Sequence, residues 1–193
     1  FVSRMFENNL RDIEPYWVCL PMGSRCAVSN YQMYWYPWDP DKEELWVRPM
    51  PKMPYIINMD NNPFDFYRYK MVQEDLYAEF GEWYSRQKKG KTICLLGIRA
   101  DESLNRYRAY ANDRKTIMQG NQWTTKMGEN WWNAYPIYDW TTKDVWIANG
   151  KFDYDYNRIY DLFWKAGLSI SQMRVASPYH ESAKESLNLY RVL

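Results

Sequence analysis

The sequence predicts an α/β fold in which strands of a mostly parallel sheet alternate with helices. Two observations lead to this prediction. Residues 73–88 carry apolar side chains at intervals of three and four, which is typical of an amphipathic helix, and residues 91–98 (KTICLLGI) follow as a nearly continuous apolar run. Such a run is typical of a strand buried on both faces of a parallel sheet. Residues 97–110 then repeat the order of strand, turn and helix, and this alternation implies βαβ units with right-handed crossovers.

The chain before this region is less regular. Residues 1–10 place apolar side chains at helical spacing and residues 16–21 (YWVCLP) form a short apolar run, so we expect a helix followed by a buried strand. Residues 22–70 are crowded with proline and aromatic residues, and proline forbids long helices there. We interpret 22–70 as an irregular, aromatic-rich insertion of turns and short strands, a kind of segment that is usually functional or a partner surface.

The helix that follows Gly97 is expected to bury one apolar side, formed by Leu104, Tyr107 and Ala111. Its other side carries three polar residues that should therefore lie together: Glu102, Ser103 and Arg106.

Local signals mark the ends of the remaining helices. Gly90, after two lysines, should close the helix over 73–88. A short strand around 135–140 leads to Thr141 and Asp144, which form a [ST]xx[DE] signal for a helix start. A helix over 157–166 should stop at Gly167. Two further short helices are expected to open at Ser169 and at Ser177 or Pro178, which makes the C-terminal part helical.

The composition excludes several classes of protein. The 193 residues contain 25 Lys and Arg against 24 Asp and Glu, a net charge of +1, so no global field holds a polyanion and any anionic ligand must be bound locally. No apolar run approaches the ~20 residues of a transmembrane helix, and no signal segment opens the chain. We therefore expect a soluble cytoplasmic protein without membrane contact.

Cysteine and histidine are too sparse for a disulfide framework or for a cysteine- or histidine-based metal site. Cys19 and Cys94 lie in apolar runs and are expected to be inert, whereas Cys26, next to Arg25, is the one thiol in a neighbourhood that could lower its pKa. His180, the only histidine, is interpreted as a surface or cap residue.

Aromatic residues are unusually frequent, at 19% of the chain, with 11 Trp, 18 Tyr and 7 Phe. They predict either a large core knitted together by rings or stacking surfaces for flat ligands such as nucleobases. The sequence leaves both interpretations open.

Residues 97–106 (GIRADESLNR) place two arginines, two acids and a serine where a strand ends and a helix begins, and ligands of open α/β sheets bind at such strand ends. Arg99 can present a planar fork to phosphate or sulfate, while Ser103 and nearby backbone amides can donate hydrogen bonds. The alternative is a capped helix with an ion pair between Glu102 and Arg106 on a solvated face.

Residues 135–146 (YPIYDWTTKDVW) form a second strand end that passes into a capped helix, with Asp139 just before the cap. Asp139 could belong to the same ligand site. The alternative is that Asp139 only orients the loop while Thr141 and Asp144 only cap the helix.

Taken together, GIRADES-x-x-R and the later P-I-x-D-W-T-x-x-D-V-W closely resemble the phosphoadenosine phosphosulfate (PAPS) reductase family, within the adenine nucleotide alpha-hydrolase-like superfamily. The segments YDYNRIYDLF and GLSISQMRVASP are similar to a subgroup of sulfurtransferases related to immunoglobulin-binding regulator proteins. The resemblance implies a doubly wound, Rossmann-like, mostly parallel sheet that binds an adenine nucleotide (PAPS, APS or ATP), with magnesium as an accompanying ion.

The resemblance also assigns nucleotide-binding positions. The first motif gives Arg99, Asp101, Glu102, Ser103 and Arg106; the second gives Asp139, Trp140 and Asp144; a weaker match gives Arg48 and Lys52. The family's phosphate loop, Ser-Gly-Gly-Lys-Asp-Ser, is not in the sequence, so residues 1–193 are interpreted as one domain that lacks its N-terminal strand and phosphate loop. No cysteine follows Cys94, so thiol-based reduction is not expected.

Two functions remain as hypotheses. The first is an enzyme of sulfotransfer or sulfur metabolism that binds an adenine nucleotide. The second is a regulatory module that keeps the nucleotide fold and uses the aromatic residues of 31–69 to contact a protein or single-stranded nucleic acid, with Arg48, Lys52, Arg68 and Lys70 available to phosphates. Catalytic residues and homo-oligomer formation are left open.

Overall fold

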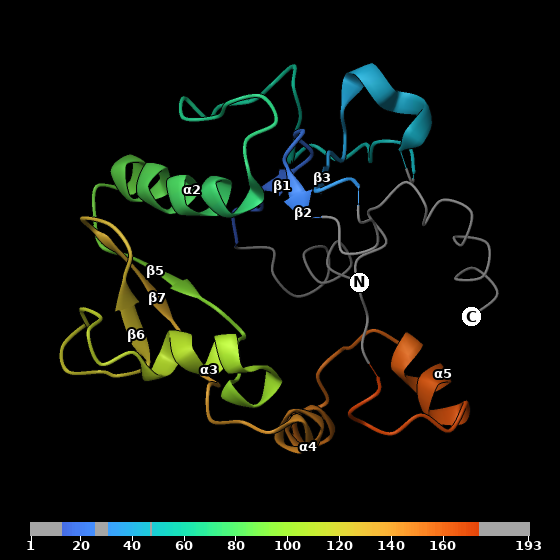
Figure 1. Ribbon diagram of the computed structural model, residues 1–193, viewed down its shortest axis with the longest axis vertical. Coiled ribbons are helices and arrows are strands. Elements are labelled where there is room, and N and C mark those ends of the chain that lie inside the picture. Colours follow the sequence, from blue (N-terminus) through green and yellow to red (C-terminus); the bar gives the residue numbers. More distant parts are fainter. Residues whose placement is uncertain (1–12, 26–30, 47, 174–193) are drawn as a thin grey trace. The chain divides into compact units, whose positions relative to one another are not determined.

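The computed structural model describes residues 13–25, 31–46 and 48–173, and the chain divides into two compact units (Figure 1). The first unit contains residues 1–76, 157–168 and 172–193, and the second contains 77–156 and 169–171. The expected helix over 1–10, Cys26, His180 and the helix expected at 177 or 178 lie outside the described residues.

The first unit is built from two small pairs of strands. β1 (Trp17–Val18) and β4 (Ile56–Ile57) are parallel, and β2 (Ser24–Arg25) and β3 (Tyr34–Trp35) are antiparallel. A 3₁₀ segment, η1 (Pro40–Leu45), follows β3. The prediction of turns and short strands in the insertion is therefore confirmed. The core of this unit consists of buried apolar residues that follow or face these strands: Cys19, Leu20, Met22, Ile57, Phe64, Met71 and Leu76.

A short helix of the first unit, α5 (Ile159–Lys165), ends as its sequence predicts. Gly167 has φ +82°, the left-handed conformation that glycine adopts without a Cβ clash, and its N–H bonds to the carbonyl of Trp164. The expected helix at Ser169 is wrong, because 169–173 form turns.

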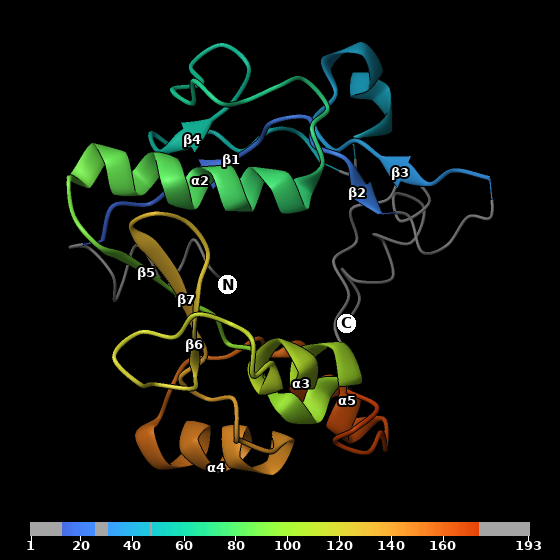
Figure 2. The same cartoon turned by 60° about the vertical axis from the view of Figure 1, so that its left-hand side comes forward.

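The second unit contains a sheet of three strands in the order β5-β7-β6. β5 (Thr92–Leu95) runs parallel to β7 (Trp131–Ala134), and β6 (Thr124–Lys126) pairs antiparallel with β7. η2 (Ala100–Glu102) and α3 (Leu104–Ala111) follow β5, and α4 (Thr142–Phe152) follows β7. Figure 2 shows this sheet and the helices α3 and α4 in a second view. A mixed α/β fold is confirmed, but a doubly wound parallel sheet is not, because the sheets formed by the described residues have two, two and three strands.

α2 (Gln73–Lys88) has the predicted bounds. Glu74 and Asp75 in its first turn and Arg86 and Lys88 in its last turn complement the helix dipole. The left-handed residue after the helix is Lys89 (φ +50°), one position before the expected Gly90.

Within the second unit, α2 packs against the middle strand of the sheet. A Cβ added to Gly81 would lie 2.7 Å from the Trp131 ring, so glycine is required for this close contact. Trp131, Trp132 and Ala134 of β7 are buried, which agrees with a strand that has a neighbour on each side.

Three expectations about this unit are wrong. Two concern burial, and one concerns the position of a strand. β5 is an edge strand that alternates in exposure, with Ile93 at 46% and Leu95 at 70%, so it is not buried on both faces. The expected strand around 135–140 lies earlier, at β7, and 136–139 form a turn. The apolar side of α3 is exposed at Leu104 and Tyr107 and is therefore not buried as expected.

Aromatic rings contribute to the core, as one of the two interpretations expects, whereas the stacking of flat ligands on exposed rings stays a prediction. Several rings are buried, including those of Trp35, Trp83 and Tyr135, and rings pack on one another, as Phe64 does on Phe66 at 5.3 Å. Other rings are exposed, among them Tyr31, Tyr77 and Trp164. No helix among the described residues is long and apolar enough to cross a membrane.

Candidate functional site

The candidate site lies in the second unit, where β5 and β7 end. Because these strands are parallel, the loops that follow them, 96–103 and 135–142, leave the sheet at the same edge. The backbone joins the loops: the N–H of Leu96 donates to the carbonyl of Ala134 at 2.9 Å, and that of Ala100 donates to Tyr138 at 2.8 Å. We call these two loops, together with Arg106, the strand-end site.

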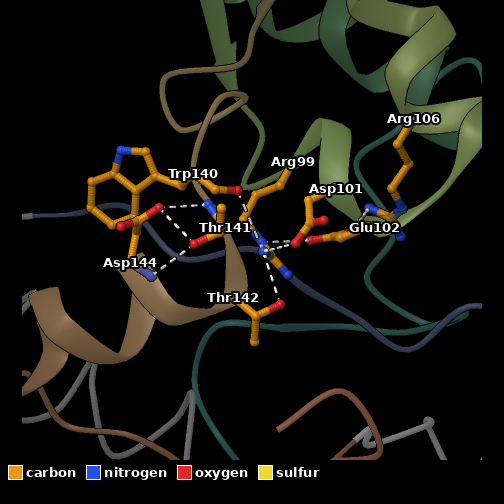
Figure 3. A network of polar contacts seen from close by, with 8 residues as sticks. All are labelled: Arg99, Asp101, Glu102, Arg106, Trp140, Thr141, Thr142 and Asp144. Atoms are coloured by element: carbon orange, nitrogen blue, oxygen red, sulfur yellow. Dashed lines mark hydrogen bonds and ion pairs between the residues drawn. The ribbon is translucent and has the colours of Figure 1, made fainter.

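Arg99 connects the two loops through its side chain (Figure 3). Its Nη1 donates to the hydroxyl of Thr142 at 3.2 Å and, at 3.5 Å, to the carbonyl of Trp140. Its Nε donates to Glu102 Oε1 at 3.2 Å, and Asp101 Oδ2 lies 3.6 Å from Nη1. Only 13% of the side chain is exposed. Arg99 therefore positions the loops, rather than presenting a free fork to a ligand.

Glu102 extends this network toward solvent. Its second carboxylate oxygen lies 2.9 Å from Nη1 of Arg106, whose side chain is 47% exposed. The pair between Glu102 and Arg106 that the sequence allowed on a solvated face is present, and it is continuous with Arg99. Arg106 is thus the cation of the network that a ligand can reach.

Three further motif residues, Ser103, Thr141 and Asp144, cap helices. Ser103 is the N-cap of α3 and accepts a hydrogen bond from the N–H of Arg106 at 3.3 Å. Thr141 and Asp144 form a reciprocal capping box at the start of α4, as their spacing predicted: Thr141 Oγ1 accepts from the N–H of Asp144, and Asp144 Oδ2 accepts from the N–H of Thr141 at 2.8 Å. Hydrogen bonds from Thr141 hold the pKa of Asp144 below its ordinary value.

Asp139 and Trp140 occupy the second loop at the same strand edge. Asp139 is exposed and Trp140 is half-buried. The backbone N–H of Trp140 donates to the carbonyl of Ile137 at 3.1 Å. The structure therefore brings eight of the ten sequence-predicted residues to one sheet edge, in two loops and the helix starts that follow them.

The other two predicted residues, Arg48 and Lys52, belong to the first unit. Both are exposed, and the Arg48 guanidinium lies 5.2 Å from the centre of the Trp17 ring. The structure supports a cation–π contact for Arg48 and does not join either residue to the strand-end site.

The strand-end site carries more acid than base. Within the site as defined, Arg99 and Arg106 stand against three carboxylates, those of Asp101, Glu102 and Asp139, which leaves one net negative charge. Among the described residues, no group of three or more Asp, Glu, His or Cys side chains is arranged to hold a metal ion. A phosphate group would therefore need a cation of its own to approach these carboxylates.

Sequence reasoning missed an aromatic cluster beside the second loop. The rings of Tyr110 and Tyr138 stack at 4.0 Å with an interplanar angle of 17°. The Lys115 ammonium lies 5.3 Å from the Tyr110 ring and donates to the carbonyl of Tyr110 at 2.6 Å. Burial lowers the pKa of Lys115, and the hydrogen bond with Tyr138 raises that of Tyr110. Since the cluster joins residues 28 positions apart, no local pattern could have revealed it.

The two described cysteines agree with the expectation of inert thiols. Cys19 is fully buried, and burial raises its pKa to about 11 although Arg48 opposes the shift. Burial also raises the pKa of Cys94. A raised pKa keeps a thiol protonated near neutral pH and so suppresses its reactivity as a nucleophile.

Comparison with known proteins finds similarity to uncharacterized ones. A family model described as a domain of unknown function (DUF3440) matches residues 167–193. The uncharacterized protein YbdN of Escherichia coli (strain K12) is 36% identical over 182 residues, which are 93% of this chain and 43% of that protein. The chain thus spans less than half the length of this relative. No solved structure matches the chain.

These findings overturn the resemblance to the PAPS reductase family and to its sulfurtransferase subgroup. The family model that matches is a different one, and the relative is described as uncharacterized. The residues behind the resemblance have roles that many strand-to-helix connections need, since Ser103 and Thr141 cap helices and Arg99 joins two loops. Such a pattern identifies a type of connection and not a family.

Proposed function

We propose that the second unit binds an adenine nucleotide, as its magnesium complex, at the strand-end site. The observation that carries the proposal is the pair of loops after parallel strands β5 and β7, held together by Arg99. Ligands of α/β sheets bind at the carboxyl ends of parallel strands, where loops meet and helices begin. A site whose loops are already fixed loses little conformational freedom when a ligand binds.

The chemistry of the exposed groups supports a nucleotide with a charged tail. Arg106 offers a partly exposed guanidinium to a phosphate, and guanidinium–phosphate pairs are strong. The half-buried ring of Trp140, in the second loop, offers a face on which a base can stack.

Magnesium enters the proposal because of the excess of carboxylates. Mg²⁺ is commonly held by one or two carboxylates together with substrate phosphates. Asp101 and Asp139 are exposed, one in each loop, and they are the residues that would face such an ion. Without the ion, the net negative charge of the site would repel a polyphosphate.

The proposal also includes a larger sheet. Thr92 of β5 and Leu96, just after β5, donate their N–H groups to Asn130 and Ala134 on the side of β7, so the alternating residues Ile93 and Leu95 direct theirs to the opposite edge. No described strand pairs with that edge, and the side chains of the same two residues are exposed and apolar. We propose that a further parallel strand lies there, which would extend the sheet toward the doubly wound form.

Isothermal titration of the chain with ATP, adenylyl sulfate and PAPS, each with and without Mg²⁺, tests the function. We expect binding that requires Mg²⁺ and weakens about 10- to 100-fold in Arg106→Ala, the range expected for one hydrogen-bonded charge. Arg108→Ala is the matched control, because Arg108 is an exposed arginine of the same helix outside the network. GTP measures selectivity for the adenine base.

The proposal fails if no adenine nucleotide binds, or if Arg106→Ala and Arg108→Ala bind equally well. Turnover of the bound nucleotide distinguishes the enzyme hypothesis from the regulatory-module hypothesis. Release of sulfite, phosphate or pyrophosphate would indicate an enzyme, whereas binding without release would indicate a regulatory module.

A further inference from the structure

Two tyrosine rings connect the second loop of the strand-end site to helix α3. Tyr138 lies in the turn at 136–139, and Tyr110 lies in the last turn of α3. Their ring centres are 4.0 Å apart with an interplanar angle of 17°, and their side chains share a hydrogen bond. We call these two residues the tyrosine pair. A stacked contact combined with a hydrogen bond fixes the orientation of Tyr138 more tightly than either interaction alone.

Lys115 fixes Tyr110 in turn. Its ammonium donates to the carbonyl of Tyr110 at 2.6 Å and lies 5.3 Å from the centre of the Tyr110 ring. The same ammonium donates to the carbonyl of Gln122 and lies 6.0 Å from the ring centre of Tyr135, at the start of the second loop. Tyr110 is therefore held in position itself, so it can support Tyr138.

The second loop is attached to its neighbours on both sides of Asp139. Before it, the carbonyl of Tyr138 accepts a hydrogen bond from the N–H of Ala100 at 2.8 Å, and the ring of Tyr138 belongs to the tyrosine pair. After it, Arg99 Nη1 donates to the carbonyl of Trp140 at 3.5 Å. The direction of the Asp139 carboxylate therefore depends on both attachments.

Asp139 is also the acid of the site that is open to a cation. The other two acids, Asp101 and Glu102, both lie against Arg99. Asp139 is exposed and makes no ion pair with another described residue. Its charge contributes to the raised pKa of Tyr110, after the hydrogen bond within the tyrosine pair and burial, so its carboxylate lies near this pair. A cation that accompanies a nucleotide can therefore meet Asp139 without displacing an arginine.

We propose that Tyr110 and Tyr138 are positioning residues of the strand-end site, which direct Asp139 toward the magnesium ion of the bound nucleotide. The inference rests on the proposed function and names the residues that prepare the site for its cation. The tyrosines act through Asp139 and do not touch the ligand. When the hydrogen bond between them is lost, the carboxylate has to be ordered during binding, which costs conformational entropy.

Isothermal titration with ATP and Mg²⁺ tests this role. Tyr110→Phe and Tyr138→Phe each remove the hydrogen bond and keep a ring in the stack. We expect each variant to bind about three- to tenfold more weakly than the wild type, the range for one hydrogen bond. Tyr107→Phe is the matched control, because Tyr107 is a tyrosine of the same helix that is 49% exposed, and it should stay within about twofold.

Double variants separate positioning from a general structural effect. In an Asp139→Asn background, Tyr110→Phe should weaken binding by less than about twofold more, because the carboxylate through which it acts is already neutral. In an Arg106→Ala background, Tyr110→Phe should keep its full three- to tenfold effect. An equal effect in both backgrounds would overturn the proposal.

Amide hydrogen exchange of the free chain gives a second readout. Tyr110→Phe should accelerate exchange at Ala100, whose N–H bonds to Tyr138, and leave Leu96, whose N–H bonds to Ala134, unchanged. Unchanged exchange at Ala100 would show that the pair does not hold the loop. If the wild type binds no nucleotide, the proposed function and the role of Asp139 fail together. If it binds and Tyr110→Phe binds equally well, the tyrosine pair alone is wrong.

Discussion

Asp39 in the first unit and Arg99 in the second each join two distant segments of chain through one charged side chain, but one cluster is closed and the other is open. Asp39 is 1% exposed, and its carboxylate receives the Lys70 ammonium at 2.8 Å and the Tyr69 hydroxyl at 2.7 Å. The network of Arg99 continues outward through Glu102 to the half-exposed Arg106.

We interpret the closed cluster around Asp39 as a stabilising element and the open network around Arg99 as a place where a ligand can bind. In the closed cluster, a ligand could reach the Asp39 carboxylate only by breaking its contacts with Lys70 and Tyr69. In the open network, Arg106 can exchange Glu102 for a ligand without disturbing the bonds between Arg99 and the second loop. We therefore expect substitutions at Asp39 to affect mainly folding, and those at Arg106 mainly binding.

Asp39→Ala gives the largest expected loss of stability. It removes two hydrogen bonds to a buried carboxylate and leaves Lys70 without its anion, which should lower the free energy of unfolding by about 2–4 kcal/mol. Denaturant unfolding measures the change. The exposed Asp60 supplies the control, and Asp60→Ala should stay within about 0.5 kcal/mol of the wild type. A small effect of Asp39→Ala would show that the cluster is not structural.

The same carboxylate predicts a pH dependence. Burial by itself would raise the pKa of Asp39, but hydrogen bonds from Lys70, Tyr69 and the N–H of Asp41, together with the charge of Lys70, outweigh it, so the pKa is lowered. A lowered pKa means that the stabilisation is fully present above the ordinary aspartate value of about 3.9 and is lost as the pH falls through the folded-state value. The stability difference between wild type and Asp39→Asn should therefore be constant near pH 6 and shrink below about pH 4.

Arg99→Ala should have the next largest effect, about 1.5–3 kcal/mol, because it removes charge-assisted hydrogen bonds that join the two loops. Unlike Arg106→Ala, it should both lower stability and weaken nucleotide binding. Hydrogen exchange should show faster opening of residues 96–103 and 135–142 than in the wild type. Normal stability with lost binding would instead make Arg99 a direct ligand contact and remove the distinction between it and Arg106.

Local signals in the sequence predicted local structure well. The bounds of α2, the capping box of Thr141 and Asp144 and the stop at Gly167 depend on residues within one or two helical turns of each other. The position of the second loop was not predicted, because the sequence placed a strand around 135–140, where the structure has a turn after β7.

Properties that depend on distant partners could not be predicted. Arg99 has its second-loop partner 43 positions away at Thr142, and Asp39 has Lys70 31 positions away. The apolar run of β5 looked like a strand covered on both faces, but burial depends on which elements pack against it, and Leu95 is 70% exposed. The free fork expected of Arg99 could not be judged from the sequence for the same reason: its Nε and Nη1 already donate to groups of the protein.

The smallest predicted effect tests whether the hydroxyls of Ser103 and Thr141 act as helix caps. Thr141→Ala removes the capping box of α4 and should cost about 1 kcal/mol, while Ser103→Ala should cost less, because Ser103 makes a single 3.3 Å bond with no reciprocal acid. Exchange of the first amides of α4 should accelerate in Thr141→Ala. Neither variant should change nucleotide affinity more than about twofold, since both hydroxyls already bond to their own helices. A loss of affinity without a loss of stability would mean that the hydroxyl of Ser103 or Thr141 contacts the ligand and does not mainly cap its helix. The strand-end site would then include residues beyond the network around Arg99.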